Sequence, residues 1–104
     1  MVLIKENITE AITMLENLLM NCVEKETNVR IHGYIDGFTV RYSSLLDEFY
    51  INHEELCLVC GWFEIDIHKT ITNIKFLVAD KSVHIIFQDG ELYIDLDEFD
   101  KILE

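Results

Sequence analysis

Apolar residues recur every three or four positions near the start of the chain, and this spacing predicts an amphipathic helix over residues 8–24. Asn7 and Glu10 have the spacing of a capping box, with Asn in place of Ser or Thr, and Asn28 is the expected stop. The apolar stripe consists of Ile4, Ile8, Ala11, Ile12, Leu15, Leu18, Leu19 and Cys22.

From residue 29 the apolar period changes to two, which is typical of a strand with one buried face. Asp36-Gly37 is a residue pair that two-residue hairpin turns prefer. Because the turn chemistry and the apolar pattern agree on one register, the sequence predicts a hairpin here. Pairing across the turn places three couples on one face: Ile35 with Phe38, Gly33 with Val40, and Ile31 with Tyr42.

Asp89-Gly90 predicts a second hairpin between strands over residues 83–88 and 91–96. An upstream strand enters a turn at residues 79–82, so that residues 72–96 are expected to form a three-stranded meander with one apolar face. The expected couples are Phe87 with Leu92, Ile85 with Ile94, Val83 with Leu96, Val78 with Val83, and Phe76 with Ile85.

The middle of the chain has a weaker pattern. Residues 49–52 are expected to form a short strand, residues 52–55 a turn, and residues 43–48 a loop or a helical turn. Residues 56–67 are expected to form one long strand with a bulge or bend at Gly61. Its expected inward residues are Val59, Gly61, Phe63, Ile65 and Ile67.

These elements predict an α+β fold in a single domain over residues 1–104. We expect an N-terminal amphipathic helix packed on an antiparallel meander sheet of six or seven strands, open or partly closed into a barrel. Helical spacing of Phe99, Ile102 and Leu103 predicts a short C-terminal helix over residues 97–104.

Charge and composition exclude several classes of protein. The chain carries 20 Asp and Glu residues against 8 Lys and Arg residues, for a net charge of −12, so we expect no direct binding of nucleic acid. The sequence contains neither a long apolar run nor a basic secretory start, so we expect no membrane association. Three cysteines do not make a disulfide framework, which favours a reducing cytosol. The Ile-, Asn-, Lys- and Glu-rich composition suits an AT-rich bacterial or phage genome, so we expect the cytoplasm of a bacterial host cell.

The spacing of reactive residues predicts no enzyme, cofactor or metal site. Cys57 and Cys60 have the spacing of half a zinc knuckle, but residues three apart in a strand point to opposite faces. We expect both to be buried and to pack as small apolar residues, with a structural zinc or a redox dithiol as the alternatives. The histidines are scattered, and hairpin pairing sets His84 opposite Asp95 and His32 opposite Arg41.

The distribution of acidic residues is the most informative feature. Between Arg41 and Lys69 there are six acids and no Lys or Arg, and from Asp89 onward there are seven acids against Lys101. Carboxylates on neighbouring strands are expected to present a grid of negative charge that imitates a polyanion. The residues predicted to bind a partner are Asp47, Glu48, Glu54, Glu55, Glu64, Asp66, Glu91, Tyr93, Asp95, Asp97, Glu98 and Asp100.

The expected function is that of a small acidic binding protein that blocks the basic nucleic-acid-binding site of a partner, such as a nuclease. Phage anti-defence proteins against CRISPR nucleases or restriction enzymes, and immunity proteins against nuclease toxins, act by this physics; the link is an analogy and not a motif. The alternative is a structural or assembly module that forms a homo-oligomer, for example a homodimer joined through a sheet edge or the helix.

Overall fold

The computed structural model describes residues 2–4 and 7–97 of the chain. These residues form helix α1 (Ile8–Lys25), nine strands and a short 3-10 turn, η1 (Val78–Asp80), so that the α+β class is confirmed while the strand number exceeds the expected six or seven. The strands are β1 (Val2–Ile4), β2 (Asn28–Ile35), β3 (Phe38–Leu45), β4 (Glu48–Asn52), β5 (Glu55–Cys60), β6 (Phe63–Ile67), β7 (Ile71–Leu77), β8 (Ser82–Phe87) and β9 (Gly90–Leu96).

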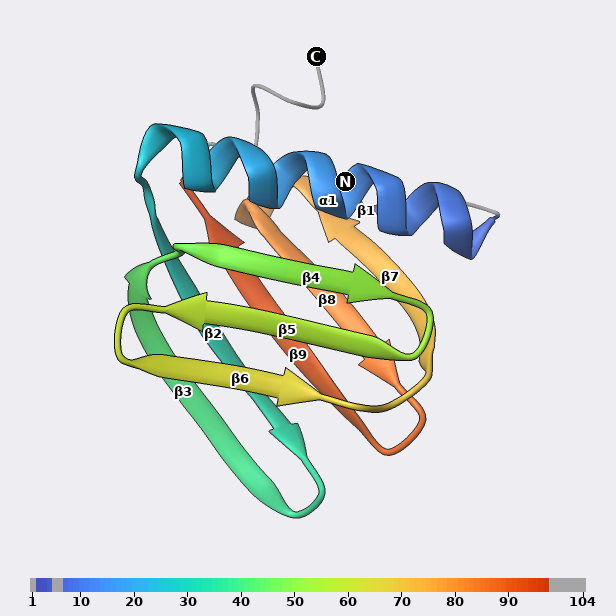
Figure 1. Ribbon diagram of the computed structural model, residues 1–104. Helices are drawn as coiled ribbons and strands as arrows, with labels where there is room; N and C mark the ends of the chain where they lie inside the picture. Colours follow the sequence, from blue (N-terminus) through green and yellow to red (C-terminus); the bar gives the residue numbers. More distant parts are fainter. Residues whose placement is uncertain (1, 5–6, 98–104) are drawn as a thin grey trace.

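The strands form two antiparallel sheets and no closed barrel. Sheet A has the order β1-β7-β8-β9-β2-β3, and sheet B has the order β4-β5-β6. Helix α1 and sheet B lie side by side over one face of sheet A, and the helix contacts both β4 and β7 (Figure 1). The buried apolar side chains of all three units form one core between these layers. No helix in the described part of the chain is long and apolar enough to cross a membrane.

The helix follows the prediction closely, because its apolar stripe is the face that meets the core. All six stripe residues from Ala11 to Cys22 are buried. The Asn7 side chain caps the helix by accepting a hydrogen bond from the Thr9 backbone N–H at 2.8 Å. Ile4 belongs to β1 and not to the helical stripe. The helix ends at Lys25, before the expected stop at Asn28, and its C-cap residue Glu26 has a left-handed φ of 53°.

The first hairpin has the predicted register throughout, and His32 lies opposite Arg41 as expected. The φ values of Asp36 and Gly37 are 54° and 83°, and a type I′ turn requires positive φ at both positions. The strand β3 extends to Leu45, so the segment expected as a loop or helical turn is shared between β3, a two-residue connection and the start of β4.

The second hairpin has the predicted faces but the wrong register. Phe87 pairs with Gly90, so the turn lies one residue earlier than expected and His84 faces Tyr93 instead of Asp95. The reason is that Gly90 lies within β9, where this strand passes close to β2: a Cβ at Gly90 would lie 2.6 Å from the Tyr34 carbonyl oxygen. The register between β7 and β8 is also shifted by two residues, since Phe76 pairs with Val83 instead of the expected Ile85. A shift of two leaves every side chain on its predicted face.

The predicted long strand over residues 56–67 is wrong, because Gly61 and Trp62 form a hairpin turn between β5 and β6. Gly61 has a φ of 61°, which supplies the positive φ of a tight turn instead of a bulge. Reversal at this turn changes the alternation, and Val59, Gly61 and Phe63 do not lie in the core. The inward residues are Leu56, Leu58, Cys60, Ile65 and Ile67. Within the described residues there is no C-terminal helix; residues 98–104, on which that prediction falls, lie outside them.

Candidate functional site

The structure divides the predicted partner-binding residues between two faces. The inner faces of sheets A and B share one core, so their outer faces point in opposite directions (Figure 1). Sheet B and its turns hold Asp47, Glu48, Glu54, Glu55, Glu64 and Asp66. The outer side of β9 and the residue after it hold Glu91, Tyr93, Asp95 and Asp97, while Glu98 and Asp100 lie outside the described residues.

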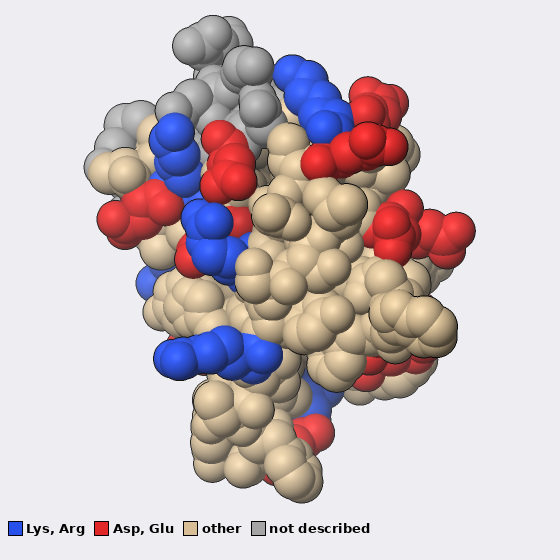
Figure 2. All heavy atoms as spheres, turned by 90° about the vertical axis from the view of Figure 1, so that its left-hand side faces the viewer, with Lys and Arg blue, Asp and Glu red and all other residues tan. Residues whose placement is uncertain are grey.

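Strand register gathers four carboxylates on the outer face of sheet B. Cross-strand pairs join Glu48 to Val59 and Val59 to Glu64, and a second row joins Tyr50, Cys57 and Asp66. Glu55 lies two residues before Cys57 on the same face. We call Glu48, Glu55, Glu64 and Asp66 the acidic face. Figure 2 shows acidic side chains projecting on the sheet B side, at the right, while most Lys and Arg side chains in this view lie toward sheet A.

The acids of sheet A have cationic or histidine partners. Arg30 lies 3.8 Å from Asp95 and 3.4 Å from Asp97, and His84 Nε2 lies 3.0 Å from Glu91 Oε2. Arg30 therefore offsets part of the negative charge of Asp95 and Asp97.

Tyr93 of the same face is not free to anchor a partner with its ring. It lies between His32 and His84, with ring-centroid distances of 5.0 and 4.1 Å and nearly parallel planes. Both faces of the phenol ring are thus covered by imidazoles, which leaves its edge as the accessible part.

The acidic face has a different set of contacts. His68, which follows β6, places Nδ1 3.3 Å from Glu55 Oε2 and Nε2 3.1 Å from Asp66 Oδ1. Between residues 7 and 97, the ion pairs of this face are made with His68 and not with Lys or Arg. Strand alternation alone predicts that residues 64, 66 and 68 share one face. Glu55 lies beside His68 because of the β5–β6 hairpin, which the sequence did not predict.

Cys57 and Cys60 point to opposite sides of β5, as strand alternation predicts. Cys60 is buried, but Cys57 is half-buried on the outer face, and its Sγ lies 3.8 Å from Glu64 Oε1. Desolvation and the carboxylates of Glu64 and Asp66 raise the pKa of the Cys57 thiol, and burial raises that of Cys60. Because the two sulfurs diverge, they do not form a shared zinc or redox site.

Exposed aromatic side chains border the acidic face. The side chain of Tyr50 is 56% exposed within it, and Trp62 in the β5–β6 turn is fully exposed. Asp47 fixes this turn by accepting a hydrogen bond from the Gly61 N–H at 2.6 Å. Two large rings are therefore presented on a constrained sheet and turn, which is the arrangement that suits interface anchors.

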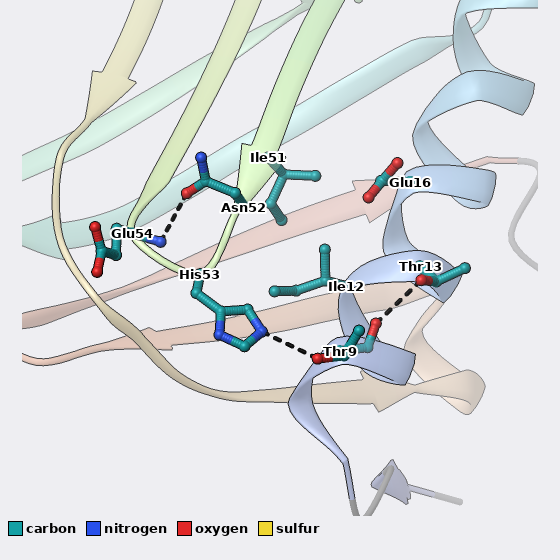
Figure 3. Close-up of a pocket in the computed structure, with 8 residues that line it drawn as sticks. All are labelled: Thr9, Ile12, Thr13, Glu16, Ile51, Asn52, His53 and Glu54. Atoms are coloured by element: carbon teal, nitrogen blue, oxygen red, sulfur yellow. Dashed lines mark hydrogen bonds between the residues drawn. The ribbon is translucent and has the colours of Figure 1, made fainter.

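A cavity of about 380 Å³ lies between α1 and the end of β4 (Figure 3). Ile12 and Ile51 point into it, and His53 Nε2 lies 3.3 Å from Thr9 Oγ1 at its edge. Among the described residues no carboxylate lies within ion-pair distance of His53, so this hydroxyl–imidazole pair lacks the orienting group of a nucleophilic site.

Comparisons with family models, with curated proteins and with solved structures find no match for this chain. The choice of function therefore depends on the geometry and charge of the two outer faces.

Proposed function

We propose that this protein is a small acidic binding protein that covers the basic nucleic-acid-binding site of a partner protein. The observation that supports the proposal is the acidic face, where four carboxylates of sheet B share one surface and the chain places no Lys or Arg between Arg41 and Lys69. The partner we propose is a nucleic-acid-acting enzyme of the bacterial cytoplasm, such as a CRISPR nuclease, a restriction enzyme or a nuclease toxin.

The spacing of the acidic face suits a groove that holds phosphates. Neighbouring strands lie about 4.8 Å apart, and residues two apart on one strand lie about 6–7 Å apart. Glu64 and Asp66 are such a pair, and Glu48 extends the row to the other edge of the sheet. The distance between successive phosphates in one nucleic-acid strand is of the same order. The net charge of −12 also speeds the encounter with a basic surface.

Short-range anchoring comes from the aromatic border. Electrostatic complementarity contributes chiefly to association rate and specificity, whereas buried aromatic anchors contribute most of the binding free energy. Tyr50 and Trp62 are exposed at the acidic face and its border, so we expect them to enter the interface.

A matched pair of variants tests the proposal. In the first, Glu48→Gln, Glu55→Gln, Glu64→Gln and Asp66→Asn neutralise the acidic face; in the second, Asp80→Asn, Glu91→Gln, Asp95→Asn and Asp97→Asn neutralise four acids away from it. Each changes the net charge from −12 to −8, since −12 + 4 = −8. Association with a panel of purified bacterial and phage-targeted nucleases is measured by surface plasmon resonance at low and high salt, with duplex DNA as a competitor.

We expect a bound nuclease to be displaced by duplex DNA, to associate more slowly as salt rises, and to lose at least tenfold in association rate with the first variant only. Equal slowing by both variants would show that only net charge matters. A nuclease that binds protein and DNA together would contradict blockage of the nucleic-acid site.

A free sheet edge supports the alternative of a homo-oligomeric assembly module. Strand β3 pairs only with β2, carries no acidic residue, and presents Phe38 with 73% of its surface exposed. An unprotected edge strand is a template for pairing with a second copy. Sedimentation equilibrium distinguishes the two functions: a mass that doubles with concentration and persists in high salt favours the assembly module, and a monomer throughout the range excludes it.

A further inference from the structure

One corner of sheet B brings together three side chains of metal-ligand type. Glu55 begins β5, Asp66 lies in β6, and His68 follows the end of that strand. One donor atom from each of the three lies within 4.8 Å of the others. Among the residues that the structure describes, no other group of three or more His, Cys, Asp or Glu side chains has donor atoms this close together.

Cross-strand pairing creates this cluster. Leu56 pairs with Ile67, so the outward residues on either side of that pair, Glu55 and Asp66, project from adjacent strands, and His68 extends the same face beyond the last pair. Glu55 is the least exposed of the three, with 28% of its side chain accessible, while Asp66 and His68 are 43% and 68% exposed. The donors therefore stand on a paired hairpin and remain open to solvent.

The charges in this corner are unbalanced. Glu55, Asp66 and the neighbouring Glu64 bring three carboxylates, whereas the imidazole of His68 carries at most one positive charge. The described residues provide no Lys or Arg contact here. A divalent cation compensates such a charge excess more completely than an imidazolium does.

Donor chemistry selects the kind of cation. Imidazole nitrogen suits Zn²⁺, Cu²⁺, Fe²⁺ and Ni²⁺, whereas an all-oxygen set suits Mg²⁺ and Ca²⁺. Ligand atoms about 2.0–2.2 Å from a tetrahedral Zn²⁺ lie roughly 3.3–3.6 Å from one another. The His68–Glu55 and His68–Asp66 contacts of 3.3 and 3.1 Å are already close to that separation, although they use different ring nitrogens. Binding of one cation by all three side chains therefore requires the exposed imidazole of His68 to turn, so that a single nitrogen faces both carboxylates.

We propose that Glu55, Asp66 and His68 form a binding site for a Zn²⁺-type divalent transition metal, with the remaining position open to water. This arrangement of three protein ligands and one exchangeable position is common for zinc. The inference concerns the isolated protein and does not depend on the partner proposed above.

Isothermal titration calorimetry with ZnCl₂ on the full chain, stripped of metal with a chelator and dialysed, tests the site at pH 7.5. We expect one Zn²⁺ per chain, and at least a tenfold weaker affinity for His68→Gln and for Asp66→Asn. His53→Gln and Asp95→Asn are matched controls on other surfaces and should retain the affinity of the unaltered chain. MgCl₂ at the same concentrations should give no saturable binding.

Amide chemical shifts locate the ion independently of affinity. We expect Zn²⁺ to perturb the amides of residues 55–57 and 65–68, with circular dichroism showing that each variant keeps its fold. Absence of saturable 1:1 binding would overturn the site. So would binding that survives both His68→Gln and Asp66→Asn, or perturbations centred on another histidine.

Discussion

Lys69 and Asp36 join two loops that are distant in the sequence, with Lys69 Nζ 2.8 Å from Asp36 Oδ1. Lys69 lies in the connection from sheet B to β7, and Asp36 lies in the β2–β3 turn of sheet A. The same ammonium group is 3.7 Å from Asp89 in the β8–β9 turn. The hydrogen bond from Lys69 to Asp36 is the main cause that raises the pKa of Lys69. One cation thus connects three loops at this end of the molecule.

Replacing Lys69 by Gln is expected to destabilise the protein in a pH-dependent manner. Because folding raises the pKa of Lys69, its stabilising contribution is fully present below the unfolded-state pKa and is lost as pH rises through the folded-state pKa. Urea unfolding should therefore give a lower midpoint for Lys69→Gln at pH 7.5, and the difference from the unaltered chain should shrink as the pH rises above 10.5, the ordinary pKa of lysine. Arg41→Gln removes the same charge from an exposed strand position and is the control. A difference between the two variants that does not depend on pH would contradict the role assigned to this contact.

Two glycines should respond differently to the same substitution. A Cβ at Gly33 would overlap the backbone oxygen of Glu91 in the neighbouring strand and lie 2.9 Å from Leu92 Cα, whereas a Cβ at Gly61 would meet nothing within 4 Å. Gly33→Ala should therefore cost about 3 kcal/mol of unfolding free energy, because neither backbone can move away without breaking the β2–β9 pairing. Gly61→Ala should cost about 1 kcal/mol through its positive φ alone. Chemical denaturation measures both, and a larger loss for Gly61→Ala would be inconsistent with this packing.

These glycines also explain what the sequence could and could not predict. The Asp36-Gly37 turn was predictable because local turn chemistry and the apolar alternation specify the same register. Gly90 has the same local signal, but its role is set by contact with Tyr34, which is distant in sequence. The faces of β7, β8 and β9 were still predictable, since alternation does not change when the register moves by two.

The Asn7 cap is expected to contribute measurably to stability. Its side chain satisfies the Thr9 N–H, one of the helix donors without a helical partner, at 2.8 Å. Asn7→Ala should lower the unfolding free energy by about 1 kcal/mol, and Asn7→Ser should restore most of the loss because Ser accepts the same hydrogen bond. Thermal and urea unfolding of both variants give the comparison. Equal stability of the Ala and Ser variants would show that the cap does not contribute.

The candidate site was less predictable than the fold. Composition showed the charge excess, but its division between two faces follows from the two-sheet topology. Glu64 and Asp66 lie beside β5 because of the Gly61-Trp62 reversal, which the alternating pattern over residues 56–67 concealed. Pairing of Arg30 with Asp95 and Asp97 depends on the adjacency of β2 and β9, strands that are far apart in the sequence. Contacts between strands that are distant in the sequence cannot be read from the local alternation of apolar and polar residues.

The two faces should respond in opposite directions when one acid is neutralised. Glu64 shares the acidic face with Asp66, two residues away on the same strand, so Glu64→Gln should relieve repulsion and raise the unfolding free energy by about 0.3 kcal/mol at low salt. Asp95 lies 3.8 Å from Arg30 and 3.7 Å from His32, so Asp95→Asn should lower the unfolding free energy by about 0.5 kcal/mol.

Both effects act through solvent-exposed charges, so both should shrink in 1 M NaCl, where screening acts over about 3 Å. Urea titrations at low and high salt measure, for each of the two variants, the difference in unfolding free energy from the unaltered chain. If both variants stabilised the protein, net charge would dominate and the Arg30 contacts would contribute nothing. If the opposite signs persisted unchanged in high salt, the effects would come from packing or hydrogen bonding. Opposite signs that converge with salt are the result expected when sheet B carries uncompensated charge and sheet A carries paired charge.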